Sequence, residues 1–163
     1  LHPRVRRQRQ MCIRDRFVST ENVSGILFLV QSACLERRFL DDPALSIEQL
    51  NCGQTRISFS LTAGTDLDHR GKVRSSVIYR LLESVLQISA VSVGVEAETL
   101  NFCCNIVKYT AAEKLYAVCK ICHCGRMTLV AEAEVYDEND TLLATVLTTL
   151  FVVETIKDIP RKW

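Results

Sequence analysis

Residues 75–91, SSVIYRLLESVLQISAV, decide the fold class of this protein. On a helical wheel the large apolar side chains share one broad arc, and the polar side chains lie opposite. The arc contains Val77, Ile78, Leu81, Leu82, Val85 and Ile88, and the polar side contains Ser76, Tyr79, Arg80, Glu83 and Gln87. This periodicity predicts one long amphipathic helix that covers an apolar surface.

The segments that follow this helix have the composition of β-strands. They are rich in β-branched and apolar residues, and residues 130–136 alternate in part with a period of two. We expect strands at about residues 95–107, 115–123, 127–136 and 142–153, with residues 137–140 as the turn of the last hairpin. Residues 55–61 also predict a strand, residues 45–50 are ambiguous, and residues 65–72 form a polar loop.

One helix followed by a run of antiparallel strands predicts an α+β fold, in which the sheet needs the helix to cover its apolar face. Another helix is predicted near the start, because residues 23–39 place apolar side chains at helical spacing before Asp41-Asp-Pro43. We therefore expect an N-terminal helix within residues 17–40, one folded domain at residues 41–156 and a C-terminal tail at residues 157–163.

We expect the first 16 residues to have a different origin from the rest of the chain. Residues 6–15, RRQRQMCIRD, are the in-frame translation of CGT CGG CAG CGT CAG ATG TGT ATA AGA GAC, which resembles a sequencing-library adaptor. We therefore treat residues 1–16 as a disordered scar and leave them out of the fold argument. The alternative is a basic arm that binds nucleic acid.

Charge and hydropathy exclude several classes of partner. Without the six arginines and one aspartate of residues 1–16, the 20 basic and 19 acidic residues fall to 14 and 18, a formal net charge of −4. No basic region then remains to favour nucleic acid. The apolar run at residues 25–30 is too short for a membrane span or a signal peptide. We expect a cytoplasmic protein without a membrane partner.

The eight cysteines do not indicate disulfides or a metal site. Their number is odd without Cys12, and Cys103 and Cys104 are adjacent, which is unlike a secreted disulfide framework. Residues 119–123 match the haem-attachment pattern C-x-x-C-H, and Cys124 adds a thiol that suggests zinc. Side chains three apart on a strand point to opposite faces, so we expect buried, reduced strand cysteines and no metal or cofactor.

The carboxyl half resembles a known family. Residues 123–140, HCGRMTLVAEAEVYDEND, and residues 149–153, TLFVV, are similar to the ending of acyl-CoA thioesterases of the phenylacetate-degradation type. In that family a strand opens with H-x-G-R-x-T, a turn follows E-V-x-D, and the last strand ends in T-F-V-V. The resemblance covers residues 46–154 and implies the hotdog fold, an antiparallel sheet wrapped around one long central helix, in a homodimer or a dimer of dimers.

The family's catalytic signature is matched only in part. It reads N-x-x-G-x-x-H-G-G, six residues and then Asp or Glu, whereas this chain has DHRGKVRSS at residues 68–76, six residues and then Glu83. Gly71 and Glu83 fit the signature, but Asp68 replaces Asn and Arg74-Ser-Ser76 replaces H-G-G. In the family, the amides at the helix start hold the carbonyl oxygen as negative charge develops.

The resemblance implies an acyl-CoA hydrolase with its pocket between two subunits. Glu83 would act as general base or nucleophile on the thioester carbonyl, and the N–H groups of Ser75 and Ser76 would hold its oxygen. The implied substrate-binding residues are Asp68, His69, Gly71, Arg74, Arg126 and Thr128. Arg74 suits a CoA phosphate or a substrate carboxylate, Arg126 suits the phosphate groups of CoA, and Thr128 would approach from the neighbouring subunit. Each has an ordinary alternative: Glu83, for example, lies three residues from Arg80 and could be a solvated ion-pair partner.

Two other functions remain open from the sequence. The loss of Asn and H-G-G favours a protein of the same fold that binds acyl-CoA or another apolar ligand without turning it over. The second alternative is a catalytically silent structural or regulatory subunit.

Overall fold

The computed structural model describes residues 20–163, and the adaptor-like segment 1–16 lies outside the described residues. Six antiparallel strands form one sheet in the order β1-β2-β4-β5-β6-β3. They are β1 (Leu45–Asn51), β2 (Gln54–Ser60), β3 (Val95–Ile106), β4 (Lys114–Cys124), β5 (Thr128–Asp137) and β6 (Leu142–Thr155). The predicted strands are all present, and the ambiguous segment before residue 51 is a strand, paired with β2 in a tight hairpin.

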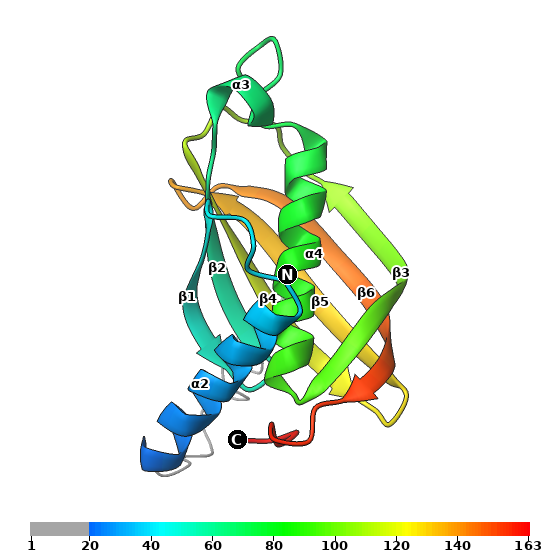
Figure 1. The fold of residues 1–163 in the computed structure, drawn as a ribbon. Coiled ribbons are helices and arrows are strands. Elements are labelled where there is room, and N and C mark those ends of the chain that lie inside the picture. Colours follow the sequence, from blue (N-terminus) through cyan, green and yellow to red (C-terminus); the bar gives the residue numbers. More distant parts are fainter. Residues whose placement is uncertain (1–19) are drawn as a thin grey trace, which may run out of the picture.

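Three helices accompany the sheet among the described residues: α2 (Thr20–Glu36), α3 (Ala63–Asp66) and α4 (Ser75–Ser92). Helix α4 lies against one face of the sheet and contacts β2, β3, β4 and β5 (Figure 1). The predicted antiparallel sheet with a helix packed on it is confirmed. Helix α2 packs beside α4, and the four-residue α3 overlaps only the start of the loop predicted at residues 65–72.

The core lies between α4 and the sheet. The apolar arc predicted from the helical wheel is buried, with Ile78, Leu82 and Val85 fully inaccessible. On β5, Leu129, Ala131, Ala133 and Val135 are buried and alternate with side chains that are exposed or only half-buried, which is the period-two pattern of a sheet with one covered face.

The cysteines divide between the core and the surface. Cys34 and Cys119 are buried, and burial raises the pKa of each thiol to about 12, so both stay protonated at neutral pH. Cys122 and Cys124 are exposed, which corrects the prediction that the β4 cysteines are all buried. Leu115, Ala117 and Cys119 alternate as the inward-facing residues of β4, so Cys122 lies on the opposite face, at the register shift between Ile121 and His123. Cys119 and Cys122 therefore do not converge, and among residues 20–163 no group of three or more potential metal ligands occurs.

One edge of the sheet is exposed, and the segment after β6 covers the carboxyl end of α4. Strand β3 is an edge strand of 12 residues, with Leu100 on it 63 % exposed. At the carboxyl end of α4, the segment after β6 packs against the helix, where the Trp163 indole donates to Ser92 O at 2.7 Å and Ile159 is buried. No helix in the described part of the chain is long and apolar enough to cross a membrane.

Candidate functional site

The loop before α4 fixes the start of the helix. Asp66 is 7 % exposed, and its carboxylate accepts a hydrogen bond from the Thr62 N–H at 2.8 Å, while its carbonyl accepts one from Arg74 N–H at 2.9 Å. Arg74 is the N-cap residue of α4, and no side chain caps the helix. The first helical bonds are donated by Val77 and Ile78, so the N–H groups of Ser75 and Ser76 precede the hydrogen-bonded turns. This end of α4 therefore favours negative charge.

Asp68 is engaged within its own loop. Its Oδ1 accepts from the N–H groups of Arg70 and Lys72 at 2.8 and 2.9 Å, and its Oδ2 pairs with the Arg70 guanidinium at 3.1 Å. These contacts, the Lys72 N–H first, lower the pKa of Asp68 to about 2. Gly71 closes the turn with a φ of +72°, in the left-handed region that glycine favours. Asp68 therefore fixes the loop conformation.

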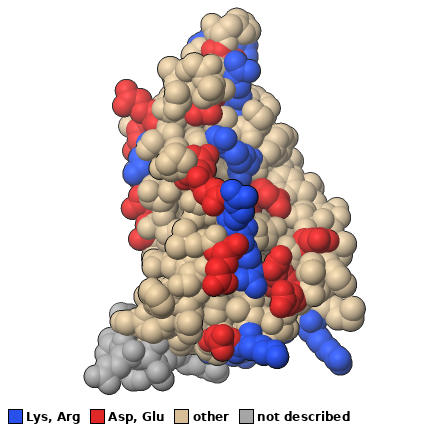
Figure 2. Space-filling model, in the orientation of Figure 1, with Lys and Arg blue, Asp and Glu red and all other residues tan. Residues whose placement is uncertain are grey.

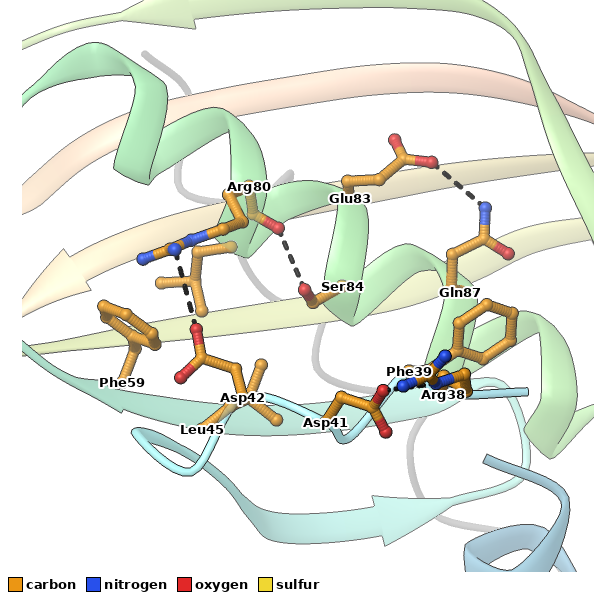
Figure 3. A pocket seen from close by; sticks show the side chains of 11 residues that line it. Arg38, Phe39, Asp41, Asp42, Leu45, Phe59, Arg80, Glu83, Ser84 and Gln87 are labelled. Atoms are coloured by element: carbon orange, nitrogen blue, oxygen red, sulfur yellow. Dashed lines mark hydrogen bonds and ion pairs between the residues drawn. The ribbon is translucent and has the colours of Figure 1, made fainter. Parts of the chain in front are cut away.

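Glu83 lies two turns further along α4, with an exposed carboxylate that two polar side chains orient. Its Oε1 accepts a hydrogen bond from the Gln87 amide at 3.1 Å (Figure 3). The Thr99 hydroxyl, on β3, lies 3.3 Å from both Oε1 and Oε2. Gln87 is one helical turn away and Thr99 belongs to a different element, so the carboxylate is held between α4 and the edge strand.

Two hollows meet at Glu83. One, which we call the β2-side pocket, has a volume of about 390 Å³ and lies between α4, β2 and the segment before β1 (Figure 3). It is lined by Arg38, Phe39, Asp41, Asp42, Leu45, Phe59, Arg80, Leu81, Glu83, Ser84 and Gln87. The other, the β3-side groove, has a volume of about 380 Å³ and is lined by Tyr79, Arg80, Glu83, Thr99 and Phe102. Arg80 and Glu83 are the residues common to both linings.

Arg80 connects the loop before α4 with the segment before β1. Its guanidinium lies 3.6 Å from Asp42 Oδ2 and 3.5 Å from Asp66 Oδ1, and 4.7 Å from the centre of the Phe59 ring. One cation is thus shared by two carboxylates and an aromatic face. Arg80 therefore fixes the wall between the two hollows.

The charges around this site are mixed. Figure 2 shows Lys and Arg side chains interleaved with Asp and Glu, and no large area of a single sign on this face among the described residues. A continuous basic surface of the kind that binds a phosphate backbone is therefore not present on this face.

Comparison with solved structures identifies the architecture. The PaaI protein of the Escherichia coli phenylacetic acid degradation operon superposes with a TM-score of 0.74 at 16 % identity, covering 82 % of this chain and 97 % of its own. A hypothetical thioesterase from Streptococcus pneumoniae with coenzyme A gives 0.64 at 19 % identity, covering 68 % and 87 %. The chain has the hotdog fold. Smu.793 of Streptococcus mutans, bound to acetyl CoA, gives 0.64 at 20 % identity, covering 68 % and 90 %. No protein-family model and no curated protein sequence matches the chain.

On the hotdog scaffold the predicted site residues fall into separate groups. His69 and Arg74 are exposed beside the start of α4, where Arg74 Nε donates to Leu67 O at 2.8 Å. Arg126 is exposed in the β4–β5 turn, next to Gly125, whose carbonyl accepts from Arg161 at 2.8 Å. Thr128 begins β5 and precedes Leu129, which faces the core. Within one hotdog subunit, Arg126 and Thr128 thus do not join the cluster at the start of α4.

Sequence reasoning missed Thr99, Gln87 and the segment before β1. The sequence indicated Gln87 weakly, because a residue four positions after Glu83 lies on the same face of the helix. Nothing in the sequence indicated Thr99, because threonine is common inside strands. Its partner Glu83 lies 16 residues away on another element of the hotdog fold.

Proposed function

We propose that this protein is an acyl-CoA thioesterase in which Glu83 acts on the thioester carbonyl. The observation that carries the proposal is the exposed Glu83 carboxylate, which is oriented by Thr99 and Gln87 where two hollows meet. Support also comes from hotdog neighbours described as thioesterases or solved with coenzyme A or acetyl CoA. In this proposal α4 is the central helix around which the sheet wraps.

Two variants of the Streptococcus pneumoniae protein support the pairing of Glu83 with Thr99. One replaces an aspartate by alanine and the other replaces a threonine by alanine, at positions 16 residues apart. Glu83 and Thr99 are also 16 residues apart. An acid on the helix and a threonine on the following strand are therefore the pair that we assign to the reaction.

In the proposed reaction, Glu83 removes a proton from water, whose oxygen attacks the thioester carbonyl. The carbonyl oxygen becomes negative and is held by the N–H groups at the start of an α4 helix. The C–S bond then breaks, the proton passes to the thiolate of CoA, and a carboxylic acid leaves. Glu83 Oε2, which accepts only from Thr99 among the described residues, is the oxygen that we assign to the base.

The proposed site requires two copies of the chain. Glu83 lies eight residues after Ser75, which places them about 12 Å apart along α4 at ~1.5 Å per residue. One carbonyl group cannot contact both, because oxyanion donors must lie about 3 Å from the oxygen. A second subunit, with its α4 antiparallel to the first, would bring its own Ser75 and Ser76 to Glu83. We therefore propose a homodimer joined along the β3 edge.

Leu100→Lys tests this dimer, because an exposed edge lysine opposes pairing between strands. We expect the wild-type chain to sediment as a dimer or a dimer of dimers, and the Leu100→Lys variant to shift toward monomer. Its rate of thiol release should fall in proportion to the fraction of chains lost from dimers. Leu147→Lys, on the internal strand β6 and 53 % exposed, is the control that keeps the wild-type mass. A fully active wild-type monomer in analytical ultracentrifugation would contradict the dimer.

Thr99→Val is expected to lower kcat by about tenfold to a hundredfold with little change in KM. The valine keeps the shape of the side chain and removes one hydrogen bond to a charged group, which contributes about 1.5–3 kcal/mol. Thr145→Val on β6 is the matched control. Unchanged kcat in Thr99→Val would remove Thr99 from the reaction.

The alternative is a hotdog protein that binds acyl-CoA without hydrolysing it. The observation that favours it is Asp68, whose two carboxylate oxygens are bonded within its own loop where the family has an amide donor. Thiol release from a panel of acyl-CoA thioesters by residues 17–163 distinguishes the two functions. The readout should be mass spectrometry, because exposed Cys103, Cys122 and Cys124 would react with a thiol dye. Thermal stabilisation by acyl-CoA without product would support the alternative.

A further inference from the structure

The β2-side pocket has a partly apolar lining that includes the exposed Glu83. Phe39, Leu45, Phe59 and Leu81 provide its apolar lining. The polar groups of its wall are already bonded to neighbours: the Ser84 hydroxyl donates to Arg80 O at 3.0 Å, and the Gln87 amide donates to Glu83 (Figure 3). An apolar group can therefore enter without leaving these polar atoms unpaired.

The charges at the rim of the pocket are paired. Arg38 Nε lies 2.6 Å from Asp41 Oδ2, and Arg80 lies 3.6 Å from Asp42 Oδ2. With Glu83, the lining has three carboxylates and two guanidinium groups. A negatively charged acyl group entering this pocket would meet guanidinium groups that are already paired with carboxylates. The three carboxylates would also repel it. The pocket therefore selects against a negatively charged group.

We infer that the β2-side pocket holds the acyl group of the substrate and selects an uncharged, apolar acyl group of short to medium length. This inference rests on the proposed thioesterase function and extends it to the substrate class. The volume of about 390 Å³ lies near the lower end of the ~300–1,000 Å³ range of small-molecule sites. The thioester carbonyl would remain at Glu83, and CoA would extend from the β3-side groove.

Phe39 limits the length of the acyl chain that the β2-side pocket can hold. It belongs to the connection between α2 and β1, and its N–H donates to Cys34 O at 2.9 Å, which fixes the backbone at the end of α2. Figure 3 shows Phe39 at one end of the pocket, near Arg38 and Gln87, with Phe59 and Arg80 at the other end. Truncating Phe39 lengthens the pocket without touching Glu83 or its two hydrogen-bond partners.

The first test is a series of straight-chain acyl-CoA thioesters from acetyl to dodecanoyl. For the wild-type chain we expect kcat/KM to rise about fourfold with each added methylene until the pocket is full, and then to fall. Phe39→Ala should move this fall to longer chains. Phe28→Ala, which alters a 69 % exposed side chain on α2, should keep the wild-type profile. The same cutoff in Phe39→Ala and wild type would overturn the inference.

The second test compares acyl groups of equal length and different charge. We expect glutaryl-CoA to be hydrolysed at least about tenfold less efficiently than valeryl-CoA, because one additional carboxylate must enter the pocket without a free cation. Equal kcat/KM values for the two thioesters would overturn the assignment of an uncharged acyl group.

Binding measurements separate failure of the pocket from failure of the proposed function. Titration calorimetry with Glu83→Gln would give the affinities of CoA, butyryl-CoA and octanoyl-CoA, with and without Phe39→Ala. Affinity that rises with acyl length and responds to Phe39→Ala supports the pocket even if the wild-type chain releases no thiol. If the wild-type chain releases thiol, but the affinities do not change with acyl length or with Phe39→Ala, the assignment of the acyl group to this pocket would be wrong. The thioesterase proposal would still hold.

Discussion

Glu83→Gln is expected to lower kcat for thiol release by about 10²–10⁴-fold, the usual contribution of a positioned general base. Glutamine has nearly the same shape as glutamate and cannot take a proton from water. Its amide oxygen can still accept the hydrogen bonds that Thr99 and Gln87 donate to Glu83. The fold and the affinity for acyl-CoA should therefore persist, and the loss should appear in kcat.

The measurement is mass-detected release of CoA under saturating thioester, with thermal unfolding of the same samples. Glu36→Gln is the matched control, because Glu36 is 76 % exposed on α2 and does not line either hollow. Wild-type turnover by Glu83→Gln would exclude Glu83 as base and as nucleophile. A Glu83→Gln variant that has lost its fold would be recognised by its melting temperature.

Gly94→Ala is expected to lower the free energy of unfolding by about 3 kcal/mol. Gly94 follows α4 with a φ of +72°, where a side chain costs about 1–2 kcal/mol. An added Cβ would also overlap the Ile159 carbonyl oxygen, which is backbone and cannot rotate away. The Gly94 carbonyl accepts from Ile156 N–H at 2.8 Å, so the turn cannot shift without losing this contact. Overpacking of this kind adds about 1–3 kcal/mol.

Gly25→Ala is the matched control for this substitution. Gly25 lies inside α2, and nothing lies within 4 Å of a Cβ added there. Alanine in a helix interior is about 0.5–1 kcal/mol more favourable than glycine, so this variant should be slightly stabilised. Urea unfolding at a fixed protomer concentration gives both values. A Gly94→Ala chain as stable as wild type would mean that the C-terminal segment does not pack tightly against this turn.

Much of the fold was predictable because local patterns and the final environment agree. The predicted helix at residues 75–91 corresponds to α4 (Ser75–Ser92), since its apolar arc is the buried face. The predicted strand at residues 95–107 corresponds to β3 (Val95–Ile106). The segment 45–50 was ambiguous because β1 is an edge strand with one clearly buried side chain, Leu50, and so lacks a strong period-two pattern.

The candidate site was less predictable, because its geometry depends on contacts between distant segments. Glu83 was found through a family signature, but the position of Thr99 depends on how β3 lies beside α4. The role of Asp68 is set by local backbone N–H groups, which no motif indicates. The β2-side pocket includes Phe39 from a connection that the sequence marked only as the end of a helix.

Because of the length of α4, the activity of the proposed dimer depends on protein concentration. In the proposed dimer, the start of each α4 and the middle of the same helix belong to different reaction centres, so neither centre is complete in a separated chain. Dilution would therefore stop turnover in a protein that is still folded, and activity per chain would follow the fraction of chains in dimers. Protein abundance itself would then control the rate, and turnover would rise more steeply than in proportion to the amount of chain.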